Sequence, residues 1–205
     1  MGVVSARYLM IATILIASAI HAGASIAGQQ KEISARQSPL YFALDVPQKI
    51  VDAGWDAKFS MRTYSITSFP TTPNDPRAEI ILINMAPGYY MNWVTEAEGM
   101  VDNFRFFRKG GSATGSQRQA NLGQFLSTYV TARAHDRDCV VFAGKRGQGG
   151  GDLAVSEGAV YMAGYYCQPA TDPLDANAIR TVLGAIGLKT IGTAGPDKTL
   201  PPLAD

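Results

Sequence analysis

Acid, base and thiol groups occur together in one short segment, His135-Asp136-Arg137-Asp138-Cys139. A thiol beside a histidine can act as a Cys/His nucleophile pair, and the same residue types can bind zinc. A zinc site needs three or four well-placed ligands, and the spacing here matches no recognised zinc motif. We therefore predict no metal site and no catalytic residue in this segment, and interpret it as a solvated turn before a strand.

The thiol of Cys139 has one possible partner, because Cys167 is the only other cysteine in the chain. The apolar runs 139–144 and 160–167 both follow a period of two, which is typical of strands. Pairing the cysteines places Val141 opposite Tyr165 and Ala143 opposite Ala163. Because this register has no slip, we predict a hairpin closed by a Cys139–Cys167 disulfide, with two free buried thiols as the alternative.

Two glycine-rich segments were considered as ligand-binding loops. Residues 110–116 have the spacing of a phosphate-binding loop up to its second glycine, but Ser116 and Gln117 stand where Lys and Ser or Thr are required. We interpret this segment as a flexible connector. Residues 147–151 contain four glycines and are interpreted as the tip of the hairpin, with a substrate-sensing flap as the alternative. No cofactor is predicted for either segment.

Positive charge is concentrated between residues 103 and 146. Eight cations and two acids give this segment a formal charge of +6, and the rest of the chain after the predicted cleavage carries −6. Because the total is near zero, the chain lacks the overall electrostatic character of a nucleic-acid-binding protein. We predict a basic face that binds an anionic lipid, a polysaccharide or an acidic protein, with intramolecular pairing to the acids of residues 45–102 as the alternative. The residues assigned to this face are Arg105, Arg108, Lys109 and Arg118.

Three aromatic residues, Tyr89, Tyr90 and Trp93, lie close together and are of the type that stacks on sugars. They precede a helical pattern of apolar residues. We therefore interpret them as the start of a helix that packs into the core.

The N-terminal residues have the pattern of an export signal, with Arg7, an apolar run from Leu9 to Ile20 and small residues up to Ala24. We predict cleavage after Ala24, with Ala27 as a second possible site, and therefore a periplasmic or secreted protein. The apolar run of about a dozen residues is shorter than the ~20 that a spanning helix needs. No transmembrane span is expected after cleavage, and an uncleaved anchor is the alternative.

The rest of the chain is expected to form one domain. Residues 1–24 are assigned to the signal peptide, 25–38 to a flexible lead-in, 39–190 to a single α+β domain and 191–205 to a disordered tail.

Hydrophobic periodicity predicts the elements of this domain. Strands are predicted at 41–44, 57–69, 79–86 and in the hairpin 139–167, and helices at 92–108, near 122–130, and from Asp172 to Gly187. The strand at 79–86 is expected to be central and covered on both faces. This order indicates an α+β fold, with an antiparallel sheet, helices packed on one of its faces and one disulfide-closed C-terminal hairpin.

The C-terminal region also resembles a group of small secreted bacterial proteins of unassigned function. They end in a Cys-Val-x-Phe strand, a glycine-rich loop, a Gly-Tyr-Tyr-Cys strand and a short apolar helix. The matching residues here are 139–142, 144–151, 164–167 and 173–188. The resemblance implies export and a disulfide, and implies no activity.

Two classes of function follow. The preferred one is an exported, non-catalytic envelope or secreted protein that binds an anionic surface or a protein partner through the basic face. The alternative is a small secreted hydrolase or lyase, whose site would lie near His135 and the two glycine-rich loops. The alternative requires His135 and a carboxylate to converge in a pocket.

Overall fold

The computed structural model describes residues 30–89, 96–122, 125–146, 159–169 and 171–189. The predicted signal segment, the predicted tail and the glycine-rich tip at 147–151 lie outside these residues. Within the predicted lead-in, the pair Lys31–Glu32 forms strand β1, which pairs with β3.

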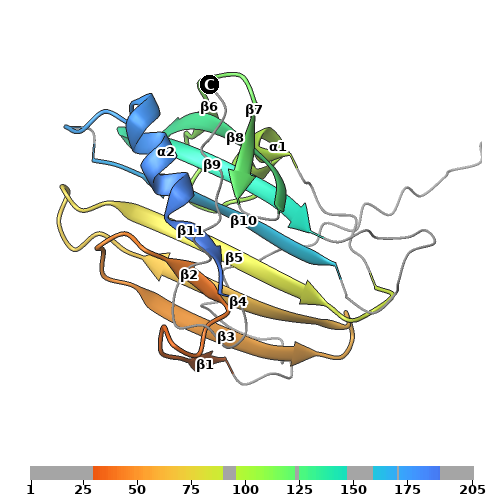
Figure 1. Ribbon diagram of the computed structural model, residues 1–205. Helices are drawn as coiled ribbons and strands as arrows, with labels where there is room; N and C mark the ends of the chain where they lie inside the picture. The colour runs from red at the N-terminus through yellow and green to blue at the C-terminus, as the bar shows by residue number, and fades with distance from the viewer. Residues whose placement is uncertain (1–29, 90–95, 123–124, 147–158, 170, 190–205) are drawn as a thin grey trace, which may run out of the picture.

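In the described part of the chain, a nine-stranded antiparallel sheet forms the body of the molecule (Figure 1). Its strands follow the order β1-β3-β4-β5-β10-β9-β8-β6, and β7 also pairs with β8. The short strands β2 and β11 pair separately. The bounds not yet given are β2 (Leu40–Phe42), β3 (Lys49–Asp56), β4 (Met61–Ser68), β5 (Arg77–Met85), β6 (Ser112–Ala113), β7 (Arg118–Leu122), β8 (Phe125–Ala134), β9 (Arg137–Arg146), β10 (Val160–Cys167) and β11 (Ile186–Leu188).

The strands β5 and β10 lie at the centre of the sheet and pair with each other. Every residue of β10 is buried. The Ile- and Leu-rich run of β5 sends alternate side chains to opposite faces, so Ile80 and Leu82 join one hydrophobic cluster and Ile81 and Ile83 join another. The prediction that this run is a central strand covered on both faces is therefore confirmed.

Different segments cover the two faces. The first face packs against helix α2 (Ala176–Gly184) and the β2/β11 pair, through residues such as Leu40 and Leu183. The second packs against helix α1 (Ala97–Val101) and the segment that follows it, where Phe104 and Phe107 are buried.

The predicted fold class is wrong. The described residues are mostly antiparallel strand, and their two short helices belong to opposite faces instead of forming a helical layer on one face (Figure 1). None of these helices is long and apolar enough to cross a membrane. The antiparallel sheet and the disulfide-closed hairpin were predicted correctly.

The helix predicted over 92–108 is limited to α1 in the described residues. The helix ends because the chain turns at Asp102, and the Asn103 side chain donates a hydrogen bond to the Gly99 carbonyl at 3.0 Å. An Asn side chain that bonds to nearby backbone favours turns over helix. The spacing of Phe104 and Phe107 still predicted burial correctly, although an irregular segment carries them.

The helix predicted near 122–130 is a strand hairpin instead. Its residues belong to β7 and β8, where Leu122 pairs with Phe125. The Ser-Thr-Tyr-Val-Thr run at 127–131 has high strand propensity, and packing between neighbouring strands decides the outcome.

Two further element boundaries differ from the prediction. The run 57–69 was predicted as one strand, but residues 57–60 form the turn between β3 and β4, and β4 begins at Met61. The last helix was predicted to start at Asp172. Its N-cap is instead Asp175, whose carboxylate accepts a hydrogen bond from the Ala178 N–H at 2.7 Å.

Candidate functional site

The disulfide joins the third residue of β9 to the last residue of β10. Cys139 and Cys167 are bonded, with their Cα atoms 4.0 Å apart, and they are register partners in the two strands. The predicted facing pairs of this hairpin are confirmed as well. Because neither cysteine is free, a Cys139/His135 nucleophile is excluded in the oxidised protein.

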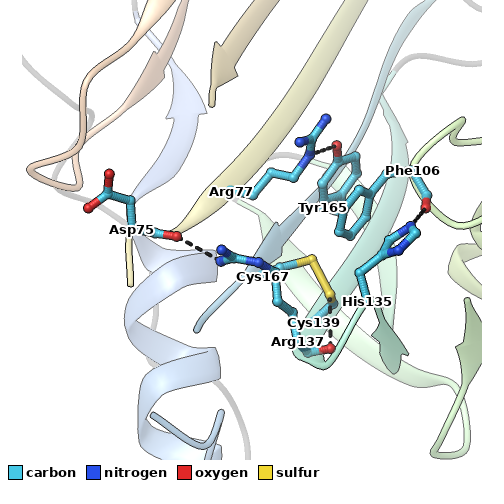
Figure 2. The surroundings of a disulfide bond; sticks show 8 residues. All are labelled: Asp75, Arg77, Phe106, His135, Arg137, Cys139, Tyr165 and Cys167. Carbon is cyan, nitrogen blue, oxygen red and sulfur yellow. Dashed lines mark hydrogen bonds between the residues drawn. A yellow bond between two sulfur atoms is a disulfide. The ribbon is translucent and has the colours of Figure 1, made fainter. Parts of the chain in front are cut away.

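We call this region the disulfide end of the sheet. It contains the two cysteines, the start of β5 at Arg77 and the β8–β9 turn at His135 and Asp136 (Figure 2). Both turn residues are exposed and have positive φ, at 51° and 60°. Positive φ at both central residues is the geometry of a tight two-residue hairpin turn, so the interpretation of this segment as a solvated turn is confirmed.

The histidine in the turn contacts the segment that follows α1. Its Nε2 lies 3.0 Å from the Phe106 carbonyl oxygen, and its ring centroid lies 4.9 Å from that of Phe106. Because a carbonyl can only accept, Nε2 carries the proton in this contact. His135 therefore fastens the turn to the covering segment.

A layered group of side chains lies beside the disulfide and was not identified from the sequence. The Arg77 Nε donates a hydrogen bond to the Tyr165 hydroxyl at 3.2 Å (Figure 2). The Arg77 guanidinium lies 4.6 Å from the Phe106 ring centroid, and the Phe106 ring stacks on Tyr165 at 5.4 Å and 9°. A cation–π contact and a hydrogen bond thus hold Arg77 against the stacked pair of Phe106 and Tyr165.

Glu79 completes this group from the same face of β5, where it is the register partner of Tyr165. Burial raises the pKa of Glu79, and hydrogen bonding to Tyr165 and the charge of Arg77 oppose the rise. Burial, and then the Glu79 charge, raise the pKa of Tyr165 to about 12. Tyr165 therefore stays protonated at neutral pH, donates to Glu79 and accepts from Arg77, which is the arrangement of a structural clamp.

Arg137 connects β9 to the loop between β4 and β5 at the disulfide end. Its guanidinium donates to the carbonyl oxygen of Asp75 at 2.7 Å (Figure 2). It also donates to the carbonyl oxygen of Pro73 at 2.8 Å. Thr71 and Thr72 donate to the Asp75 carboxylate and lower its pKa to about 2. The proline-rich loop between β4 and β5 is thereby fixed against β9, and Arg137 is engaged inside the fold.

The four predicted binding residues are all exposed, but they fall into two groups. Arg105, Arg108 and Lys109 lie in the segment after α1, which covers the second face of the sheet. Arg118 lies on the first face of the sheet. It is two residues from Ala120 in β7, so both share a face, and Ala120 belongs to the cluster that includes α2. The structure therefore brings three of the four together and separates the fourth.

The other cations of the basic region have separate positions. Arg133 lies opposite Asp138 across β8 and β9, with 4.0 Å between their nearest charged atoms. Lys145 and Arg146 lie at the other end of β9. Intramolecular ion pairing thus involves part of the basic segment 103–146. None of the ion pairs among the described residues includes Arg105, Arg108 or Lys109.

A cavity of about 240 Å³ lies between β7, β8 and α2, and its lining includes Arg118, Ser116 and Thr131. This volume is below the roughly 300–1,000 Å³ of ordinary ligand pockets. His135 is not among the lining residues, so this cavity does not provide the pocket that the enzyme alternative requires. The neighbouring loop is fastened to β8, since Thr114 N donates to the Thr131 carbonyl at 2.8 Å.

The described residues contain no group of three His, Cys, Asp or Glu side chains that could hold a metal ion. The sequence did not predict the contact between Arg77 and Tyr165. Glu79 was the sequence signal for this contact, because a charged residue inside an apolar central strand requires a partner when buried.

Comparison with known proteins gives no assignment, because no protein-family model, curated protein or solved structure matches this chain.

Proposed function

We propose that this chain is an exported, non-catalytic envelope or secreted protein that binds an anionic surface or protein partner. Its binding residues are Arg105, Arg108 and Lys109, which we call the cationic segment. One observation carries this proposal: three exposed cations lie within five residues of a segment whose neighbouring side chains are buried.

Two buried phenylalanines fix the position of the cationic segment on the sheet. Phe104 is 4% exposed and Phe107 is 2% exposed, and both rings contact Tyr165 edge-on at 5.1 and 5.3 Å between centroids. Arg105 and Arg108, which adjoin these anchors, are exposed, and the Arg108 guanidinium donates to the Asn103 carbonyl at 3.3 Å. A fixed cluster of positive charge loses less conformational entropy on binding than the same charges on a mobile loop.

The candidate chemical groups support a binding role more than a catalytic one. The thiols form the disulfide, the Nε2 of His135 donates to a carbonyl, and burial raises the pKa of the Tyr165 hydroxyl to about 12. The disulfide also supports an oxidising compartment, in agreement with the predicted export.

A charge-reversal experiment tests this proposal. The variant Arg105→Glu/Arg108→Glu/Lys109→Glu is compared with a control of equal net charge, Lys31→Glu/Arg36→Glu/Arg180→Glu, whose cations are exposed elsewhere. Each protein is applied to immobilised dextran sulfate and eluted with salt. The wild type and the control should elute together, and the cationic-segment variant at clearly lower salt.

Equal losses in both variants would contradict the proposal, because retention would then reflect net charge alone. Thermal unfolding provides the fold control. Substituting exposed charges is expected to change stability by no more than about 0.5 kcal/mol each.

A further inference from the structure

The end of the sheet opposite the disulfide exposes a group of large apolar side chains. Of the described residues, five large hydrophobic side chains are exposed, and four of them belong to this end, each with at least 46% of its surface accessible. The four are Trp55, Phe59, Tyr89 and Leu126. The fifth, Phe69, lies at the disulfide end, where the Arg77 guanidinium covers its ring at 5.2 Å.

Strand register places these four residues at the same end, which we call the aromatic end. Trp55 and Phe59 lie at the β3–β4 turn, Tyr89 follows β5, and Leu126 begins β8. The pairs that connect these positions across the sheet are Asp56 with Met61, Met61 with Met85, Asn84 with Val160, Val160 with Arg146, and Lys145 with Leu126. The arrowheads of β3, β5 and β9 all point to this end (Figure 1).

Two lysines accompany the apolar side chains. The Lys58 ammonium lies 5.1 Å from the Phe59 ring centroid, and Lys145 is the exposed register partner of Leu126. Among the described residues, neither lysine takes part in an ion pair. Aromatic rings interleaved with cations are typical of surfaces that enter the headgroup region of an anionic bilayer.

Two acids on the β3–β4 side of this end, Asp52 and Asp56, have local partners. The Asp56 carboxylate accepts hydrogen bonds from the N–H groups of Lys58 at 2.9 Å and Phe59 at 3.3 Å. Asp52 forms an ion pair with Arg62, and this hydrogen bonding lowers the Asp52 pKa. Hydrogen-bonded and paired carboxylates oppose an anionic surface less than free ones, so Asp52 and Asp56 offset the charge of Lys58 only in part.

The direction of β1 relates this end to the membrane. Lys31 pairs with Asp52 and Glu32 with Val51 in antiparallel register, so the chain preceding Lys31 joins the sheet on the side of Trp55. The predicted export segment, with its apolar run 9–20, is therefore attached at the aromatic end. If this segment stays uncleaved as an anchor, the alternative to the predicted cleavage, the anchor joins the sheet on the side of the aromatic end.

We propose that the aromatic end docks on an anionic lipid bilayer. Trp55, Phe59, Tyr89 and Leu126 enter the headgroup region, and Lys58 and Lys145 contact the lipid phosphates. This inference does not depend on the proposed function, because the cationic segment lies elsewhere, beside Phe106 and the disulfide end.

The test uses Trp55 as the reporter. The chain has two tryptophans, so a Trp93→Phe background leaves Trp55 as the single fluorophore. The protein is recovered from the producing cell and mixed with vesicles of phosphatidylglycerol and phosphatidylcholine whose acyl chains carry bromine. Trp55 emission should shift to shorter wavelength and be quenched, and pure phosphatidylcholine vesicles should quench it several-fold less.

Two variants make the test specific. In the same background, Phe59→Ser/Tyr89→Ser/Leu126→Ser should reduce quenching at least tenfold at equal lipid concentration. Phe69→Ser, an equally exposed ring at the opposite end, should leave it unchanged.

Three results would overturn the proposal. Unquenched Trp55 in the presence of anionic vesicles means that the aromatic end does not contact lipid, including when the chain is otherwise membrane-anchored. If Trp55 emission shifts to shorter wavelength only when sedimentation shows self-association, this end binds a second copy of the chain. Protection only by a neutral polysaccharide would assign it to sugar stacking.

Discussion

Removing the disulfide should destabilise the protein strongly. Cys139 and Cys167 lie 28 residues apart in the sequence, so their bond restricts a loop of that length in the unfolded chain. The chain-entropy model assigns about 3.5 kcal/mol to such a closure at 25 °C. Both residues are at most 1% exposed, so truncation to alanine also removes buried contacts and adds to the cost.

The assay is thermal unfolding of Cys139→Ala/Cys167→Ala against the wild type. For a domain of this size, about 3.5 kcal/mol corresponds to a decrease in Tm of roughly 7 to 14 °C. A reducing agent should produce a decrease in the wild type and none in the variant. A variant melting within about 2 °C of the unreduced wild type would refute the loop-closure reasoning, and thiol labelling of the denatured, unreduced wild type should detect no free thiol.

Two further changes test the disulfide end. Tyr165→Phe should lower the free energy of unfolding by about 1–3 kcal/mol in urea titration, because Glu79 loses a donor and Arg77 loses an acceptor inside the fold. Tyr89→Phe, at an exposed ring, is the matched control. Equal stability of the two variants would contradict the structural role of Tyr165. Asp75→Asn tests acid sensitivity: since the folded pKa of about 2 lies below the ordinary 3.8, the Asp75 contribution is present above pH 4 and lost as the pH falls through 2. The urea midpoint of this variant should therefore depend less on pH between 4 and 2, and an unchanged slope would show that the Thr71 and Thr72 contacts do not couple to folding.

The sequence predicted the central hairpin well because two independent signals agreed there. The period of two in 139–144 and 160–167 specified strands, and the positions of the only two cysteines specified the register. The strand β5 was equally clear, since a continuous run of β-branched residues is typical of a strand buried on both faces.

The helices predicted over 92–108 and near 122–130 failed for a different reason, whereas the last predicted helix is present as α2. The spacings of four and three that separate Met100, Phe104 and Phe107 indicate which side chains are buried, and an irregular segment can satisfy them as well as a helix can. Around 127–131, spacing and β-propensity disagreed, and pairing with β9 outweighed the spacing. Local periodicity cannot determine such cases, because the deciding contacts come from distant parts of the chain.

The candidate site was predicted in part for the same reason. The composition identified Arg105, Arg108 and Lys109, which are neighbours in sequence and remain neighbours in space. It could not separate Arg118, because the face that Arg118 occupies depends on the pairing of β7 with β8. The contact between Arg77 and Tyr165 joins residues 88 positions apart and follows from the β5–β10 register.

Amide hydrogen exchange with and without dextran sulfate tests the central claim most directly, because it locates the bound polymer on the chain. If the cationic segment is the binding site, added protection should concentrate in residues 102–111, and the cationic-segment reversal should abolish it. Protection around Arg118 or in the β8–β9 turn, with none in 102–111, would contradict the account.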